Sequence, residues 1–335
     1  LSPDAIHPSG GFPNYTNPDG RRFEYTAMML NDGEIDNRGF ELSVKSTNIS
    51  TKNFVWSSMF NLSTNRSKVL KLNNGQARFQ YIRPHGSYEE KEYIILKENE
   101  PLSAIYGYVF EGIIQQGEHY KPQPNSVAGD PKFKDLNHDG IIDERDRKVL
   151  GTGIPKTILG LQNTLTYKNI DFSMFWEASL GAKMLNLTRI YLEDNNRIRE
   201  SMDRWTQGGR NMTDANGHTY ATAGNPSTSV PRKGYTRKAE VQYGSYINSR
   251  FVENANYLKL RNVELGYTLK GSSLKLNFIQ TIRLFVGAQN LFTITKYKGF
   301  DPDISTNGSS AVAQGLDLNS YPAYRTFNFG GKITF

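Results

Sequence analysis

The segment 135–146 has the residue types and the spacing of a calcium-binding loop. Oxygen-bearing side chains stand at its first, third, fifth, ninth and twelfth positions, which are Asp135, Asn137, Asp139, Asp143 and Asp146. Gly140 occupies the sixth position, where such loops need a sharp turn, and Ile141 at the seventh would offer its backbone carbonyl. Since Ca²⁺ prefers six to eight oxygen ligands, we predict that these five side chains and the Ile141 carbonyl bind a structural Ca²⁺ ion.

Two features of the loop limit what the ion could do. Asp146 stands where the standard loop has Glu, and its shorter side chain makes bidentate coordination harder and lowers the expected affinity. No pair of long helices is predicted beside the loop. The ion would therefore hold a long connection in place rather than drive the helix opening of a calcium sensor. Ile142 is expected to anchor the loop in apolar surroundings, and His138 to point outward. The alternative interpretation is a solvated acidic turn shaped by Gly140.

No other constellation in the sequence points to catalysis. The five His residues are scattered, no Cys is present, and neither a nucleophile elbow nor a phosphate-binding loop occurs. Acidic pairs such as Asp301 and Asp303 could be imagined as the two carboxylates of a glycosidase. Carboxylates on loops are more often simply solvated. We therefore predict that the chain is not an enzyme and has no catalytic residue.

The elements that must position the loop are predicted to be long β-strands. Apolar and polar residues alternate over seven segments: 39–47, 53–65, 157–167, 170–179, 257–269, 280–291 and 324–335. Several of them are about ten to twelve residues long, which is enough to cross a bilayer when tilted. Short polar links alternate with two long insertions, 66–154 and 186–250, which we expect to be irregular apart from a helical turn or two within 192–205. This asymmetry of connections is typical of an outer-membrane barrel.

The composition supports strands with one apolar and one wet face. Only 37% of the residues are hydrophobic, yet 12% are aromatic, which suits aromatic girdles better than an aliphatic core. No run of about 18 apolar residues could form a transmembrane helix. The net charge of +7 comes from basic residues spread along the chain, so we predict no nucleic-acid partner.

The two ends of the sequence suggest a piece of a larger protein. The chain begins at Leu1 and shows no signal peptide, which a secreted or outer-membrane protein needs. Its last predicted strand alternates aromatic residues and ends on Phe335, like the terminal signal of bacterial outer-membrane proteins. We therefore expect the chain to be a fragment of an outer-membrane protein.

Several motifs, taken in order, resemble the SusC/RagA-like TonB-dependent transporters of the Bacteroidetes. The most specific is the run 288–303, AQNLFTITKYKGFDPD. Further matching segments are 37–42, 61–66, 106–113, 129–133 and 321–335. The chain departs from the family pattern at Asn254, where an acidic residue or glycine is usual, and at Lys259, where arginine is common.

The resemblance implies an all-β fold, the C-terminal strands of an antiparallel transmembrane β-barrel of roughly 22 strands with long extracellular loops. Residues 1–335 would be the C-terminal portion of this barrel, without the signal, the plug and the first strands. The barrel would lie in the bacterial outer membrane, in contact with its lipid. It would import oligosaccharides or oligopeptides with energy from TonB, reached through the missing N-terminal region, under a SusD-like lipoprotein lid.

Two other functions stay open at this point. The first is a passive porin or the scaffold barrel of a surface assembly, which an intact plug and TonB-contacting segment upstream would argue against. The second is a soluble, calcium-dependent, lectin-like β protein, which extraction without detergent would favour.

Overall fold

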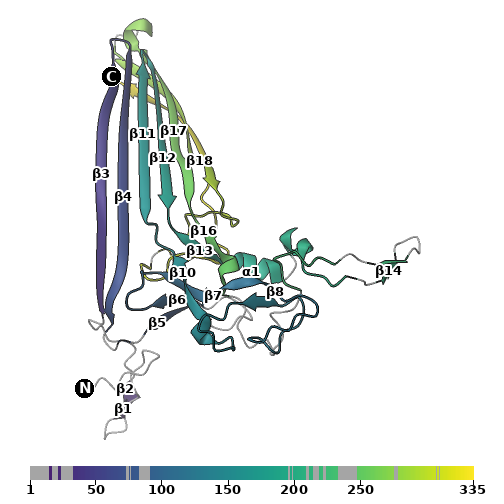
Figure 1. Cartoon of the computed structure of the whole chain (residues 1–335). Coiled ribbons are helices and arrows are strands. Elements are labelled where there is room, and N and C mark those ends of the chain that lie inside the picture. The colour runs from purple at the N-terminus through teal and green to yellow at the C-terminus, as the bar shows by residue number, and fades with distance from the viewer. Residues whose placement is uncertain are drawn as a thin grey trace.

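The main element of the fold is a seven-stranded antiparallel sheet, here called the wall (Figure 1). The computed structural model describes residues 15–16, 22–23, 33–72, 75, 77–82, 91–194, 197, 199–208, 211–213, 219–221, 224–232, 247–274, 278–306, 308 and 310–335. The strands of the wall, in spatial order, are β20 (Thr326–Thr334), β18 (Thr281–Thr295), β17 (Tyr257–Lys270), β12 (Ile170–Leu180), β11 (Thr157–Tyr167), β4 (Phe54–Leu72) and β3 (Gly33–Ser50).

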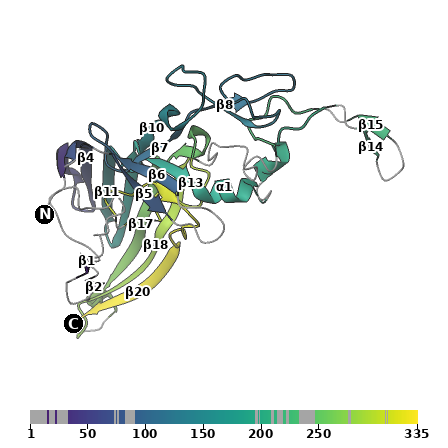
Figure 2. The same cartoon turned by 90° about the horizontal axis from the view of Figure 1, so that it is seen from below.

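The connections of the wall differ sharply between its two ends. Residues 51–53, 168–169 and 271–280 make short links, the last beginning with the 3₁₀ helix η5 (Gly271–Leu274). These links lie at one end of the wall, beside the C-terminus (Figure 1). At the other end the described residues of the long connections 73–156, 181–256 and 296–325 form what we call the loop layer, spread over that end of the curved wall in Figure 2.

The wall has one apolar face, because the strand register aligns apolar residues across neighbouring strands. One row contains Phe172, Leu265, Val286 and Phe329 in consecutive strands. Phe329 is 90% exposed and Val286 54% exposed. The polar side chains on this face hydrogen-bond to one another, since Asn163 Oδ1 accepts from Ser58 Oγ and from Trp56 Nε1. A broad exposed apolar surface of this kind requires an apolar environment.

The opposite face of the wall is polar. The row next to the apolar one contains Ser173, Glu264, Gly287 and Asn328. This alternation follows from the two-residue period of a strand, which sends successive side chains to opposite faces. The sequence-based prediction of one apolar and one polar face is therefore confirmed for these strands.

Smaller elements pack together in the loop layer. One sheet consists of β10 (Arg147–Thr152), β7 (Ala104–Tyr108), β6 (Lys91–Leu96) and β5 (Arg78–Ile82), and another of β16 (Val252–Asn254), β13 (Lys183–Asn186) and β19 (Leu316–Asp317). The remaining pairs of the loop layer are β8 (Phe110–Ile113) with β9 (Pro131–Phe133) and β14 (Asn211–Thr213) with β15 (Thr219–Ala221), while β1 (Tyr15–Thr16) and β2 (Arg22–Phe23) pair outside it, before β3. The helices are η2 (Glu144–Asp146), α1 (Leu187–Asp194), η3 (Arg199–Asp203) and η4 (Ser249–Phe251).

The core of the loop layer joins segments far apart in the sequence. Ile94, Ile105, Leu185, Phe251 and Leu316 are fully buried in one apolar cluster. They come from β6, β7, β13, η4 and β19, so all three long connections contribute. The loop layer is therefore a packed unit rather than a set of independent loops.

The structure confirms the all-β prediction and corrects two of its details. The insertion 66–154 was expected to be irregular, yet it supplies the four-stranded sheet of the loop layer. The helical turns expected within 192–205 are present as the end of α1 and as η3, but the helical segment begins earlier, at Leu187. Short strands whose partners lie far away in sequence give no local periodic signal, which explains the first error.

Within the described residues, no helix is both long and apolar enough to cross a membrane.

Candidate functional site

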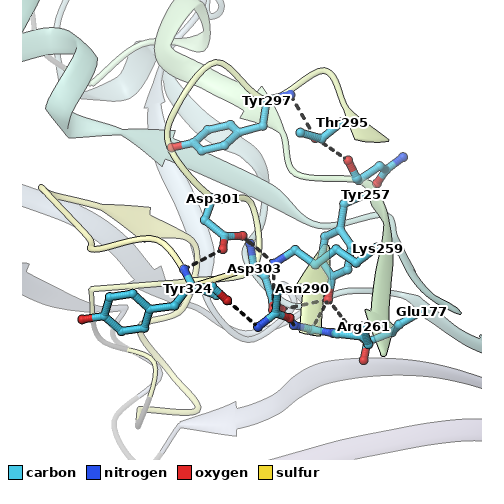
Figure 3. Close-up of polar contacts among 12 residues, drawn as sticks. Glu177, Tyr257, Lys259, Arg261, Asn290, Thr295, Tyr297, Asp301, Asp303 and Tyr324 are labelled. Carbon is cyan, nitrogen blue, oxygen red and sulfur yellow. Dashed lines mark hydrogen bonds and ion pairs between the residues drawn. The ribbon is translucent and has the colours of Figure 1, made fainter. Parts of the chain in front are cut away.

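A cluster of charged side chains lies where the wall meets the loop layer (Figure 3). Strand β17 supplies Tyr257, Lys259 and Arg261, strand β12 supplies Glu177, and the connection after β18 supplies Asp301 and Asp303. We call these six residues the ion-pair cluster. It brings together residues from two adjacent strands and from one long connection of the loop layer.

A β-bulge puts the cluster on the polar face. Val263 lies in the apolar face, and counting back by two would place Arg261 and Lys259 there as well. The register instead shifts between Leu260 and Asn262 against both neighbouring strands. The extra residue, Arg261, is the bulged one, and beyond it the parity of the strand reverses. Lys259 therefore pairs across the sheet with Glu177 on the polar side.

The neighbouring strand adapts to the bulge as well. Asn290 of β18 has φ +50°, a left-handed conformation that asparagine tolerates better than most residues. Its Nδ2 donates to the Tyr324 carbonyl at 3.1 Å, and its Oδ1 lies 3.5 Å from Arg261. The bulge thus also ties the wall to the chain just before β20.

The cluster is compact and its charges are well matched. Lys259 is 1% exposed, and its Nζ lies 2.6 Å from Asp301 Oδ1 and 3.2 Å from Asp303 Oδ2. One Arg261 nitrogen lies 2.6 Å from both Glu177 Oε1 and Asp303 Oδ2. The Tyr257 hydroxyl lies within 2.8 Å of carboxylate oxygens of Glu177 and Asp303. Two cations thus face three carboxylates, with a hydroxyl between them.

The electrostatics favour the ionised form of Asp303. Burial by itself would raise the pKa of Asp303, but the charge of Lys259 and the bonds from Tyr257 and Arg261 lower that pKa overall. Nearby, burial and the Asp317 carboxylate raise the pKa of the Tyr297 phenol, whose hydroxyl donates to Asp317 at 2.5 Å. Tyr297 therefore stays a neutral donor within the same connection.

The cluster holds both ends of the connection 296–325 against the wall. Asp301 Oδ1 accepts from the Asp303 N–H, and its Oδ2 accepts from the Ala323 N–H. At the start of the connection, Thr295 Oγ1 donates to the Asn256 carbonyl. Asp301 and Asp303, which could have been imagined as a glycosidase pair, are thus both engaged by Lys259. The arrangement positions a loop rather than presenting a nucleophile and a base.

A second ionic group lies further along the polar face. Arg283 of β18 lies between Asp171 of β12 and Glu264 of β17, with Glu264 Oε1 at 2.7 Å. The sequence left open whether Arg283 and Glu264 face the interior, and the register places both on the polar face. The group links three consecutive strands of the wall.

The predicted calcium loop folds back on itself through side-chain to backbone bonds. Asp135 Oδ1 accepts from the His138 N–H at 2.7 Å, and its Oδ2 accepts from the Gly140 N–H at 2.9 Å. Asp146 is fully buried and accepts from the N–H groups of Leu136 and Asp143. Both ends of the loop therefore carry carboxylates that turn the backbone inward.

The middle of the loop is exposed and is held by an arginine. Arg145 lies 2.6 Å from both Asp139 Oδ2 and Asp143 Oδ2, and its bonds lower the pKa of Asp143. Asn137 Nδ2 donates to Asp139 Oδ2 at 2.9 Å. Ile141 is exposed, at 54%. Among the residues that the structure describes, no three His, Asp or Glu groups converge as a metal site.

The flanking predictions for this loop are confirmed. Ile142 is fully buried and packs with Tyr108 and Phe133, so the loop is anchored in an apolar cluster. His138 is exposed and has φ +61°. Gly140 has φ +82°, the conformation that its place in the turn requires.

The sequence did not identify the ion-pair cluster as a unit. Lys259 was noted only for standing where arginine is common, and Asp301 and Asp303 only as part of a motif and as an imaginable glycosidase pair. The signal that could have found them is a lysine embedded in a strand, since a buried lysine needs a partner carboxylate. The motif FDPD at 300–303 supplies two such carboxylates.

Comparison with known proteins gives a consistent set of relatives. The chain is 34% identical to the TonB-dependent receptor P3 of Formosa agariphila over 92% of its own length, and 30% identical to the TonB-dependent receptor P26 of the same organism over 93%. It is 26% identical to the TonB-dependent receptor SusC of Bacteroides thetaiotaomicron over 95%. The chain spans only 30%, 30% and 28% of these relatives. No family model matches it.

Solved structures share the fold at lower sequence identity. The RagAB peptide transporter superposes with a TM-score of 0.66 at 22% identity, covering 95% of this chain and 31% of that chain. The RagAB peptide importer in its closed-closed state gives 0.63 at 21% identity, covering 96% and 32%. The wall and the loop layer together therefore form a known arrangement.

Proposed function

This chain is related to the SusC/RagA-like TonB-dependent transporters, and we propose that it forms part of the wall of an outer-membrane barrel that imports an oligomeric nutrient. The wall would be the C-terminal strands of a barrel of roughly 22 strands. Cargo would be an oligosaccharide or an oligopeptide, and energy would come from TonB.

The observation that carries this proposal is the apolar face of the wall. Its rows of exposed Phe, Leu and Val side chains run across consecutive strands, and its other face is lined with charged and polar groups. An outer-membrane barrel needs this division, with lipid on one side and a wet interior on the other. A soluble β protein would leave the apolar face in water, which is unfavourable.

The position of the loop layer supports a partner on the outside. Tight turns in such barrels face the periplasm and long loops face outward, so the loop layer would lie at the cell surface. A SusD-like lipoprotein would sit over it as a lid, which the likeness to the RagAB transporter and the kinship with SusC support. A passive porin or scaffold barrel is the second candidate. It is less favoured, because the relatives are TonB-dependent receptors.

Placing a charge on the apolar face should prevent assembly. We expect Val286→Arg, in the full-length protein, to destabilise the lipid-embedded wall by about 2–4 kcal/mol, because the guanidinium would lie among acyl chains. The level in the outer membrane and the TonB-dependent uptake of labelled oligomers should fall together. Stability is measured by urea unfolding in lipid vesicles, and uptake with and without an uncoupler.

Gln289→Arg is the matched control, because Gln289 is exposed on the polar face of the same strand. It should leave both assembly and uptake close to wild type. If Val286→Arg folded normally and stayed soluble without detergent, the membrane-wall proposal would be wrong. If both variants assembled but uptake never depended on the protonmotive force, the porin alternative would be favoured.

We also propose that the loop 135–146 binds Ca²⁺ as a structural ion, through the side chains of Asp135, Asn137, Asp139, Asp143 and Asp146 and the Ile141 carbonyl. What supports this is the spacing of the oxygen donors and the positive φ of Gly140, which lets the loop curl. Binding would require Arg145 to leave Asp139 and Asp143, since one guanidinium now neutralises both carboxylates.

Replacing Arg145 therefore offers a test in which a mutation should raise the Ca²⁺ affinity of the loop rather than lower it. Arg145→Gln should strengthen Ca²⁺ binding to the full-length protein, from a Kd in the range of about 10⁻⁴–10⁻³ M typical of extracellular modules, because it removes a competing cation. Asp135→Asn should weaken binding by tenfold or more. Titration calorimetry measures both, with protease protection of the loop as a second readout.

Glu144→Gln is the control, since Glu144 is an exposed acidic residue of the same loop outside the ligand positions. A structural acidic turn would behave differently. It would show no heat of Ca²⁺ binding in the wild type or in Arg145→Gln, and no protection that a chelator reverses.

A further inference from the structure

A cavity with two lysines lies at the junction of the wall and the loop layer. Its volume is about 490 Å³, within the range of small-ligand sites. Its lining combines residues of β4, residues just before β11 and just after β12, and β10 with its flanking residues. The lining includes Lys156 and Lys183 and contains no acidic residue. Arg66 of β4 also lines the cavity, but strand alternation places its side chain on the apolar face, with Thr64 and Phe40.

These two lysines differ from the cations of the two ionic groups on the polar face. Lys259, Arg261 and Arg283 are all neutralised by carboxylates within ion-pair distance. In the described part of the chain no carboxylate pairs with Lys156 or Lys183. Two like charges at one cavity create a positive potential that a bound anion would relieve.

Two glycines with positive φ make room for the lysines. A Cβ on Gly151 (φ +155°) would lie 2.5 Å from Lys183 Cγ, and a Cβ on Gly181 (φ +90°) would lie 2.9 Å from Lys156 Cβ. The stems of both lysines therefore lie directly against bare glycine backbone. A lysine held in this way loses less conformational freedom when it binds a ligand than a free surface lysine does.

The cavity opens on the polar side of the wall. Ser67 continues the polar row that contains Asn61, Ser63 and Asn65. The Leu102 N–H, next to the lining residue Pro101, donates to Ser67 Oγ at 3.3 Å, so the loop layer covers this side of the wall. In a barrel the polar face is the interior, which cargo reaches and membrane lipid does not.

We propose that this cavity binds an anionic group on the imported oligomer, a carboxylate or a sulfate of an acidic chain. The proposal rests on the function proposed above and narrows its substrate class. Lys156 and Lys183 would each donate charge-assisted hydrogen bonds to the anion. Charge-assisted bonds of this kind make binding strong but sensitive to salt.

The test uses the full-length protein in detergent and defined probes. Tetragalacturonate and pentaglutamate are the anionic probes, and maltotetraose and pentaglutamine are the neutral ones. We expect one of the anionic probes to bind, with affinity that falls as salt is raised. The double variant Lys156→Gln/Lys183→Gln should weaken that binding by tenfold or more, whereas Lys183→Arg should retain most of it.

The control is Lys52→Gln/Lys168→Gln, which removes the same charge from the tight-turn end of the wall. It should leave probe binding unchanged, and a gel-mobility assay for heat-resistant barrel structure confirms that both double variants fold. Lys156→Gln alone, at an exposed position, is a second variant if the lysine double fails to fold.

Three outcomes would overturn the proposal: no binding of either anionic probe, equal weakening by the control, or loss of co-purifying lipopolysaccharide phosphate instead of probe affinity. The last would assign the cavity to a lipid headgroup. Uptake is scored separately in cells. If uptake is independent of TonB while the probes still need Lys156 and Lys183, the import proposal fails and the anion site stands.

Discussion

Lys259→Met is expected to release the connection 296–325 from the wall. The Lys259 ammonium is buried, and it faces Asp301 and Asp303 at 2.6 Å and 3.2 Å. Methionine fills a similar volume but leaves a buried carboxylate without its cation. Removing one partner of a buried ion pair typically costs about 3–5 kcal/mol, far more than the pair itself contributes over an apolar replacement.

The readout should be local rather than global. Native-state hydrogen exchange of the full-length protein would follow the N–H groups of Asp303 and Ala323, which donate to Asp301. A loss of about 3–5 kcal/mol corresponds to exchange that is faster by two orders of magnitude or more. Amides of the tight-turn end of the wall should keep their protection.

Two further variants separate charge from packing. Lys259→Met/Asp301→Asn should recover part of the protection, because it removes the uncompensated carboxylate. Arg38→Met breaks an exposed pair with Asp36, whose arginine side chain is 84% exposed, and should change stability by less than about 1 kcal/mol. If Lys259→Met behaved like Arg38→Met, the ion-pair cluster would have no role in holding the connection.

The difference between the wall and the cluster shows what a single sequence can predict. Alternation revealed the strands because a two-residue apolar period survives in any strand with one wet face. The hairpin of β11 and β12 around residues 168–169 was predicted almost to the residue. The boundaries of β3 and β4 ran longer than expected, since hydrogen bonding between strands continues through polar residues once the pairing is established.

The cluster escaped prediction for two physical reasons. Strict alternation from Val263 assigns Lys259 to the apolar face, and only the bulge at Arg261 reverses that. The partners of Lys259 lie on a connection that returns to the wall after the next strand, so no local pattern links them. The anion cavity is similar, because Lys156 and Lys183 lie on either side of β11 and β12 in the sequence and meet only once those two strands have paired.

Gly153→Ala is expected to separate two connections of the loop layer. A Cβ at Gly153 would lie 2.2 Å from the Gln314 carbonyl oxygen and 2.4 Å from the Gly315 nitrogen. Both are backbone atoms, so no side chain can rotate away. Overpacking typically costs about 1–3 kcal/mol, and we expect the upper end of that range here.

The surroundings of Gly153 explain why the change cannot be absorbed. The Gly153 N–H donates to the carbonyl of buried Ser103, and Ser103 Oγ donates to Ala311 and accepts from the Gln314 N–H. Gly315 in turn accepts from the Leu185 N–H of β13. Segments from all three long connections therefore cross at this point, and moving one of them breaks hydrogen bonds of the other two.

Gly117→Ala provides the matched control for this prediction. Gly117 has φ +79° with nothing within 4 Å of an added Cβ, so its replacement carries only the backbone penalty of about 1 kcal/mol. Gly153 has no positive φ, so its penalty is purely steric. Hydrogen exchange at the Leu185 and Gln314 amides should rise in Gly153→Ala and not in Gly117→Ala. Equal exchange in the two variants would mean that the backbone around Gly153 shifts without losing these hydrogen bonds. The loop layer would then be held together by its apolar core instead.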